Sequence, residues 1–496
     1  MSEFKRQHPV AAVTRAIDLI RDNLITVIII LIFGAGGGGP SFLWMFAGLF
    51  VFLLIAGAAG WWRFVYRVED GELQIHQGIL VRKRFYMTRD RIQVIDVTSG
   101  IIQRIFGLVK VEIKTAGSTS REASLSAVSR AEADVLTDLL RKTPGSSRSP
   151  EKAASADDAE AARFTLPLKD LLIAASTSGS FGIALSIIAT VFSQIEPLLD
   201  ESEVYNWFLA VMPGETDTLF IVSVLLLFVV FAWLMSFFGT LFRFGDFNLT
   251  LHEDEIVIRR GIFEKKRITV PFNRIQAVRI VEGVLRQPFG YGTVYVESAG
   301  YGDQKGSGSV VLFPLIKQRE LDAFLQRILP EYRCNLQAVK PPPRAVSRYI
   351  IRSAAVFALV LAGIHWLLGG GAFIWFLLIP GFFWGWLRFR DSAAGVDKER
   401  IVIRGRILAR TTAVVRRNRA QDITGSSSWI QRIRGLANID VSVASGDQGR
   451  KFQIRELDSR DAQMLLPWLE KDFRAGGGGE RIPATDACLP GWGFSR

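Results

Sequence analysis

The first copy of a repeated pattern begins at Gly78-Ile79-Leu80, continues at Arg91-Ile92-Gln93 and ends at Gly107, fourteen residues beyond the glutamine. The same residue types return at the same spacings in a second copy, and in a third copy that holds one inserted residue: Gly261, Arg274, Gln276 and Gly290, then Gly405, Arg419, Gln421 and Gly435. Self-similarity of this length is typical of internal repetition. The sequence therefore predicts three copies of one structural unit.

Each copy has the pattern of a small β-domain that closes with one helix. Apolar and polar residues alternate in three stretches that are each followed by the first glycine, residues 72–76, 256–260 and 401–404, and further strands are predicted at residues 109–115, 293–297 and 439–443. The closing helix of the first copy begins near Ser129, with Glu132 placed to complete a capping box. Its predicted apolar face and those of the other copies are Val135, Leu136, Leu139 and Leu140; Leu321, Phe324, Leu325 and Ile328; and Met464, Leu465 and Leu469. Pro467 should shorten the third helix.

Apolar segments precede each copy in pairs. The pairs are residues 24–38 and 41–62, residues 171–195 and 219–241, and residues 353–368 and 372–387. A helix needs roughly 20 apolar residues to cross a bilayer core of ~30 Å, so the longer segments can span, whereas the third pair can span or form a re-entrant hairpin. The chain is thus predicted to be a multi-pass α-helical membrane protein with three α+β domains, each a small β-barrel capped by a C-terminal helix.

The predicted boundaries follow from these patterns. They are an N-terminal segment at 1–23, a transmembrane hairpin at 24–62, a domain at 63–142, a linker at 143–170, a hairpin at 171–241, a domain at 242–335, a proline-rich linker at 336–352, a hairpin at 353–387, a domain at 388–474 and a disordered tail at 475–496.

Charge placement predicts the orientation in a membrane. Lys and Arg lie beside the hairpins on the domain side, whereas the turn at residues 194–218 holds acidic residues and no Lys or Arg. Because Lys and Arg are enriched in cytoplasmic loops, both termini and all three domains are predicted to lie in the cytoplasm. These flanks account for the net charge of +12, so nucleic-acid binding is not expected.

The glycines, the Arg-Ile-Gln steps and the Arg104-Ile105-Phe106-Gly107 and Gln287-Pro288-Phe289-Gly290 segments resemble the bacterial pleckstrin-homology-like (PH-like) domain. Three such domains with paired apolar segments resemble the membrane proteins of the YdbT type. The third copy departs from the pattern, because Ala420 replaces the isoleucine and Arg434 stands where the other copies have phenylalanine. The resemblance implies a smaller PH-like membrane protein as a partner and a contribution to protection against membrane-active antimicrobial peptides.

Basic residues recur a few positions beyond the first glycine of each copy. They are Arg82, Lys83 and Arg84; Lys265, Lys266 and Arg267; and Arg406 and Arg410. On the predicted topology they lie close to the cytoplasmic leaflet, where each charge can contribute ~1 kcal/mol of attraction to anionic lipids. Three interpretations remain open: general attraction to the leaflet, a specific head-group site, or a solvated strand face. The repeated Arg and Gln of the Arg-Ile-Gln step are predicted to satisfy backbone groups at a barrel end, with ligand binding as the alternative.

The sequence predicts no catalytic constellation, no cofactor and no metal site, since its two cysteines and four histidines are scattered. The hypothesis that fits best is a non-enzymatic integral membrane scaffold or interaction protein of the bacterial cytoplasmic (inner) membrane. The lipid bilayer, with its anionic lipids, is the expected partner. The alternative is a transporter or extruder of a lipid or peptide, which would require a polar cavity between the helices.

Overall fold

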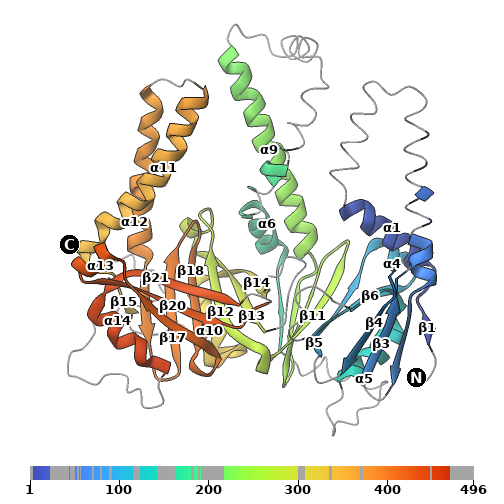
Figure 1. The fold of residues 1–496 in the computed structure, drawn as a ribbon. Coiled ribbons are helices and arrows are strands. Elements are labelled where there is room, and N and C mark those ends of the chain that lie inside the picture. The colour runs from blue at the N-terminus through green and yellow to red at the C-terminus, as the bar shows by residue number, and fades with distance from the viewer. Residues whose placement is uncertain are drawn as a thin grey trace. The chain divides into compact units, whose positions relative to one another are not determined.

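The computed structural model describes residues 4–22, 57–69, 72–78, 81–88, 92–115, 123–141, 162–179, 217–299, 308–333, 338–368, 372–446 and 449–469, with isolated positions between 44 and 190. The chain divides into two compact units, residues 1–269 and 270–496, which we describe separately (Figure 1). The first hairpin, the 143–161 part of the first linker and the tail lie largely or wholly outside the described residues, as do the last part of the first segment of the second hairpin, Arg91, Cys334 and Cys488.

Repeat 1 forms a core of its own in unit 1. Strands β1 (Lys5–Arg6), β2 (Val65–Glu69), β3 (Glu72–Gln77) and β4 (Lys83–Thr88) make one antiparallel sheet. Strands β5 (Ile92–Ser99), β6 (Leu108–Thr115) and β7 (Ala123–Ser129) lie across the core from it, and α5 (Arg130–Arg141) covers one end. Phe64, Leu73, Val111 and Leu136 are buried between these elements. The predicted alternation and the closing helix are confirmed, and Ser129 Oγ accepts a hydrogen bond from Glu132 N at 3.2 Å.

The sheet of β5–β7 continues into the next repeat. The order of strands is β7-β6-β5-β11-β10-β9-β8. Strands β9 (Asn248–Leu251), β10 (Glu255–Arg260) and β11 (Lys265–Pro271) come from repeat 2, and β8 (Arg163–Thr165) lies in the segment predicted to be a linker. Strand β11 pairs antiparallel with β5, with Lys265 opposite Ser99, Lys266 opposite Thr98 and Arg267 opposite Val97. A single seven-stranded sheet therefore joins two repeats.

Unit 2 repeats this arrangement with the second half of repeat 2 and the first half of repeat 3. Its seven-stranded sheet has the order β14-β13-β12-β18-β17-β16-β15. The strands are β12 (Ile275–Glu282), β13 (Tyr291–Ser298), β14 (Ser309–Lys317), β15 (Ala338–Val339), β16 (Ala393–Val396), β17 (Arg400–Arg406) and β18 (Arg410–Arg416). Strand β12 pairs with β18 from Ala277 opposite Val415 to Glu282 opposite Arg410.

Repeat 3 closes on a three-stranded sheet of β19 (Ala420–Ser426), β20 (Leu436–Val443) and β21 (Arg450–Asp458). Trp468, Ile401 and Ile439 are buried in its core. The closing helices of repeats 2 and 3 are α10 (Gln318–Ile328) and α14 (Ser459–Leu465), and the 3-10 turn η9 (Leu466–Leu469) follows where Pro467 ends α14. Two side chains predicted on apolar faces, Val135 and Met464, are instead exposed.

Two described helices are long and apolar enough to cross a membrane, over Leu225–Phe244 and Pro343–Gly363. The first lies in α9 (Asp217–Phe244), which follows α6 (Leu168–Ser176), and the second lies mainly in α11 (Val346–Leu368). In unit 2, α11 is followed by the 3-10 turn η7 (Ala372–Leu377) and by α12 (Leu378–Asp391), which packs along it (Figure 1). A Cβ atom on Gly385 would lie 2.5 Å from Ile350 Cα, so glycine is required for the close approach of the two helices. The described residues thus contain two candidate spans, and the multi-pass arrangement stays a prediction.

Candidate functional site: loops at the ends of the apolar helices

Each repeat has a tight turn after its first glycine, and in the first two repeats the glycine is required there. The φ angle of Gly78 is 108° and that of Gly261 is 104°. A Cβ atom would lie 2.0 Å from Val81 O in the first turn and 2.0 Å from Glu264 O in the second, a separation that no side chain tolerates. In repeat 3 the inserted residue moves the turn beyond Arg406, and Gly405 is part of strand β17.

A second loop follows the strand that carries the Arg-Ile-Gln step. It contains α4 (Ile101–Ile105) in repeat 1, the 3-10 turn η4 (Gln287–Phe289) in repeat 2 and α13 (Trp429–Ile433) in repeat 3. Each ends on a glycine in the left-handed region: Gly107, Gly290 and Gly435 have φ angles of 66°, 66° and 62°. This agreement shows that the three predicted glycines occupy equivalent positions.

The glycine turn of repeat 2 is hydrogen-bonded to the last turn of α9 in unit 1. Gly261 N donates to Gly245 O at 2.7 Å, and Ile262 N donates to Phe242 O at 2.9 Å. The rings of Phe242 and Phe263 lie 4.5 Å apart. Arg104, at the end of α4, donates to Ile262 O at 3.1 Å and so brings the second kind of loop to the same place.

Unit 2 builds the same arrangement at the ends of α11 and α12. Trp384 Nε1 donates to Ile407 O at 3.0 Å, and Arg388 Nε donates to Arg406 O at 3.2 Å. At the start of α11, Ser347 Oγ accepts from Arg434 at 3.0 Å, and Arg344 donates to Gly435 O at 3.3 Å. Both loops of repeat 3 therefore lie where the apolar helices meet the β-domain.

Large apolar side chains are exposed on these loops. Ile407 is 81% exposed and Trp429 is 71% exposed. We name the set the apolar rim; it comprises Val81, Ile101, Ile105, Phe106, Ile262 and Phe263 in unit 1, and Val284, Leu285, Phe289, Ile407, Leu408, Trp429, Ile430 and Ile433 in unit 2. Within each unit, exposed apolar groups gathered at equivalent loops indicate an interaction surface, since soluble surfaces rarely hold them together.

Two of the three basic clusters are placed beside the rim. Arg82, Lys83 and Arg84 are exposed at the start of β4, and Lys265 and Arg267 are exposed at the start of β11, where Lys266 is half-buried. Lys265 Nζ lies 3.6 Å from Asp246 Oδ2, just beyond the end of α9.

Arg406 and Arg410 are placed differently from the expectation. The Arg406 side chain is 1% exposed and forms an ion pair with Asp391 at the end of α12, and Arg410 forms an ion pair with Glu282. Burial by itself would lower the pKa of Arg410, but the hydrogen bond and charge of Glu282, together with Asp391, raise it above its ordinary value. These two side chains hold unit 2 together, and we leave them out of the candidate lipid-contacting surface. Their neutralising acids lie on other elements, Asp391 at the end of α12 and Glu282 in β12, so the basic pattern alone could not reveal this.

The Arg-Ile-Gln step is resolved best in repeat 2. Gln276 is buried, and its Nε2 donates to Arg274 O at 3.1 Å. This bond is of the predicted kind, since it satisfies a backbone group. Arg419 is half-buried and Gln421 is exposed in repeat 3, and the Gln93 side chain lies outside the description.

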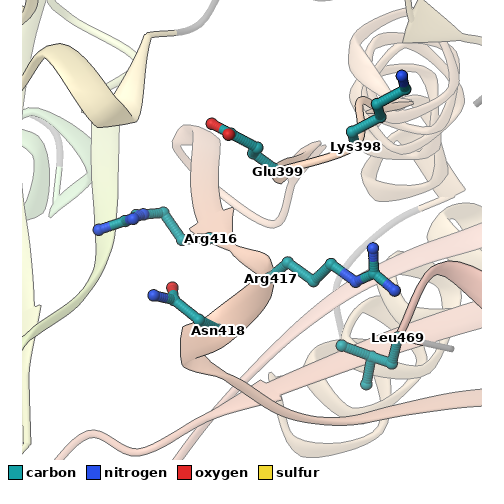
Figure 2. Close-up of a pocket in the computed structure, with 6 residues that line it drawn as sticks. All are labelled: Lys398, Glu399, Arg416, Arg417, Asn418 and Leu469. Atoms are coloured by element: carbon teal, nitrogen blue, oxygen red, sulfur yellow. The ribbon is translucent and has the colours of Figure 1, made fainter. Parts of the chain in front are cut away.

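A surface hollow of about 690 Å³ lies in repeat 3, away from the rim (Figure 2). Its lining residues are Lys398, Glu399, Arg416, Arg417, Asn418 and Leu469. Figure 2 shows the side chains of Arg416 and Arg417 pointing in opposite directions, and Arg416 forms an ion pair with Glu331. The mixture of charges and the engaged arginine give no chemical preference for a ligand. Among the described residues, no group of three His, Cys, Asp or Glu could hold a metal ion.

Comparison with known proteins identifies a family and a relative. The bacterial PH domain family matches residues 16–143, 197–332 and 348–473. The UPF0699 transmembrane protein YdbT of Bacillus subtilis (strain 168) is 31% identical over 494 residues, which cover 94% of this chain and 98% of that protein. No solved structure is significantly similar. The predicted resemblance is confirmed, and the chain belongs to the bacterial PH domain family, with the domain repeated three times.

Proposed function

We propose that this chain is a non-enzymatic integral membrane scaffold whose three PH-like domains are held against the cytoplasmic leaflet of the bacterial inner membrane. The observation that carries the proposal is the apolar rim: exposed loops that are hydrogen-bonded to the domain-side ends of α9, α11 and α12. A helix end and a loop joined by hydrogen bonds must lie at a similar depth. If the helices span, the rim lies at the membrane interface.

The charges beside the rim support the same orientation. Arg243 lies in the last turn of α9, Arg388 and Arg390 lie in the last turn of α12, and Arg344 precedes α11. Basic residues at a helix end next to exposed aromatic and aliphatic side chains are typical of the cytoplasmic interface. The membrane-spanning relative supports a membrane location for this chain. We extend this to the multi-pass topology with both termini and all three domains in the cytoplasm.

The rim and the two exposed basic clusters would act together. Apolar side chains inserted into the interface leave water, and each nearby Lys or Arg adds ~1 kcal/mol of attraction to an anionic leaflet. Because sheets continue from one repeat into the next inside each unit, the domains would form a platform for other proteins. The partner and the protection against membrane-active peptides that the resemblance implies stay predictions within this proposal.

Depth-dependent quenching in the full chain tests the rim. Cys334→Ser and Cys488→Ser are introduced first, and an environment-sensitive dye is attached to Leu408→Cys, or to Lys398→Cys as the matched control. Both positions are exposed, and they flank the two ends of β17 (Arg400–Arg406), so they are separated by roughly 25 Å of extended chain. In nanodiscs of anionic lipid, spin-labelled lipid should quench the dye at position 408 and leave the dye at 398 unchanged. Equal quenching at both positions would refute the placement of the rim.

Accessibility in spheroplasts tests the sidedness separately. Cysteines in place of Glu201 and Glu215, in the acidic turn of the second hairpin, should react with a membrane-impermeant maleimide. Cysteines in place of Lys83 and Lys266 should react only after the membrane is opened. Labelling of the basic positions in intact spheroplasts would overturn the cytoplasmic orientation.

A further inference from the structure

The two seven-stranded sheets join successive repeats at equivalent positions. In unit 1 the joining strands are β5 of repeat 1 and β11 of repeat 2, with Ser99 opposite Lys265. In unit 2 they are β12 of repeat 2 and β18 of repeat 3, with Glu282 opposite Arg410. Ser99 and Glu282 each lie six residues beyond the glutamine of the Arg-Ile-Gln step. The two junctions therefore have the same register when residues are counted from the Arg-Ile-Gln step of each repeat.

A hydrogen bond that involves the second loop of a repeat accompanies the strand pairing at both junctions. Arg104, three residues before Gly107, donates to Ile262 O in the turn of repeat 2. Gln287, three residues before Gly290, accepts a hydrogen bond from Arg406 of repeat 3. In both junctions the same loop position reaches the glycine turn region of the next repeat.

The first and last repeats leave one half of this junction uncovered. Strand β4 of repeat 1, equivalent to β11 and β18, is the outermost strand of its sheet among the described residues, and so is β19 of repeat 3, equivalent to β5 and β12. The side chains of β12 are mostly buried, whereas those of β19 from Thr424 to Ser426 are exposed. Arg432, at the loop position of Arg104 and Gln287, is exposed and forms no side-chain hydrogen bond or ion pair with the described residues.

We propose that β4 of one copy of this chain pairs antiparallel with β19 of a second copy, continuing the junction between molecules. The register of the internal junctions places Lys83 opposite Ser426 and Arg84 opposite Gly425. A second copy is the occupant because this chain supplies both halves of the junction, and copies in one membrane share their orientation. The contact is head-to-tail, so it builds a ring if it closes and a row if it does not.

The composition of the two edges fits a contact between these two unlike strands. Unpaired strand edges invite indiscriminate pairing, and Lys and Arg on an edge are a common protection. Strand β4 carries Lys83 and Arg84, while β19 carries Gly425 and Ser426. The partner edge thus has small and polar residues opposite the long basic ones, which leaves room for their side chains.

Cysteine pairs in the full chain test the register in native membranes. In a Cys334→Ser, Cys488→Ser background, two differently tagged populations carry Lys83→Cys and Ser426→Cys, so only a contact between copies can join the tags. Residues directly opposite in antiparallel strands have Cα atoms about 4.5–5.5 Å apart, within the range of a disulfide. In an equal mixture, each Lys83→Cys edge meets a Ser426→Cys edge in about half of the contacts, so mild oxidation should shift about half of each population to a band with both tags.

Two control pairs make the result decisive. Thr98→Cys with Lys266→Cys in one chain lies across the internal junction of unit 1 and should oxidise within the chain. Lys83→Cys with Gln421→Cys is displaced five residues along β19 and should give background only. The proposal is overturned if the internal pair forms but Lys83 and Ser426 do not, if the displaced pair forms as well, or if Lys83→Cys is captured by a different protein. None of these outcomes depends on the depth of the apolar rim.

Discussion

In unit 1, β11 meets β5 over three residue pairs, whereas in unit 2, β18 meets β12 over six. The equivalent basic residues at the two junctions have different surroundings. Lys265 lies opposite Ser99 with its side chain exposed, whereas Arg410, with a side chain 12% exposed, lies opposite the buried Glu282. Unit 1 thus joins its two repeats by strand pairing at a solvent-exposed position. Unit 2 joins its two repeats by the same pairing together with buried ion pairs.

Glu297 connects the junction of unit 2 to the second half of repeat 3. Glu297 of β13 accepts hydrogen bonds from Arg279 at 2.8 Å and from Ser445 at 2.8 Å, and Arg450 lies 3.3 Å away. Because Arg279 belongs to repeat 2 while Ser445 and Arg450 belong to repeat 3, one carboxylate ties two repeats together. We expect unit 2 to lose more stability than unit 1 when equivalent junction residues are changed.

The largest difference is expected where the junction strands begin. Ile275 is fully buried, and Ile92 is half-buried at the equivalent position. Ile275→Asp would place a carboxyl group without a partner in the core and should destabilise by about 5 kcal/mol, whereas Ile92→Asp can reach water and should cost about 2 kcal/mol. Thermal unfolding in mild detergent measures both. Ala420 at the third equivalent position is also half-buried and packs against the core of repeat 3, so Ala420→Asp should cost about as much as Ile92→Asp. Equal losses at positions 275 and 92 would contradict the comparison.

The next largest effect concerns the buried ion pair. Arg410 Nε lies 3.0 Å from Glu282 Oε1, and Glu282→Ala would leave the guanidinium buried without this partner. Breaking such a pair costs about 3–5 kcal/mol. Ser99→Ala at the equivalent position loses only a hydrogen bond to Leu108 O and should cost about 1 kcal/mol. Replacing both partners, Glu282→Leu with Arg410→Met, should recover part of the lost stability, as measured by chemical unfolding. No recovery would show that the ion pair stabilises unit 2 beyond cancelling its own two charges.

The repeats, most strands and the closing helices could be predicted because their signals are local. Residues 72–76, for example, alternate in a way that matches the burial of Leu73 and Ile75. The glycines that end the second loop were also recognisable, since equal spacing from the Arg-Ile-Gln step marks equal places in the fold.

The continuous sheets could not be predicted, because the partner of β5 lies more than 160 residues away and leaves no periodic trace between them. The reason that the burial of Arg406 could not be predicted is different, because its partner Asp391 lies only 15 residues away. Asp391, which forms an ion pair with Arg406, is the last residue of the apolar helix α12. The sequence alone therefore suggests a charge that flanks a membrane span. The apolar rim was partly visible in the Ile105-Phe106 and Pro288-Phe289 pairs, but the sequence did not show whether these side chains face a core or the surface.

Acid sensitivity should also be greater in unit 2. Burial by itself would raise the pKa of Glu297, but Arg279 and Arg450 outweigh it and hold the pKa below its ordinary value of about 4.3. A carboxyl whose pKa is depressed on folding stabilises the protein above its unfolded pKa, and this contribution is lost as the pH falls through the folded pKa. Unfolding measured from pH 6 to about pH 3 should show this loss. Glu297→Gln should flatten that part of the profile, and an unchanged slope would exclude Glu297 as its source.

The smallest effect is expected at Lys265. Its ion pair with Asp246 spans 3.6 Å, and the side chains are 57% and 64% exposed, so water and salt screen the attraction. Lys265→Ala should change the free energy of unfolding by no more than about 0.5 kcal/mol, and less at high salt. Arg410→Ala at the equivalent position of the next repeat should cost several times more, because it leaves the buried carboxylate of Glu282 with the hydrogen bond from Gln318 and no ion-pair partner. Comparing the two substitutions by thermal unfolding at low and high salt separates the two kinds of junction. If both cost the same, strand pairing alone stabilises both sheets, and the buried ion pairs of unit 2 select a register without adding stability.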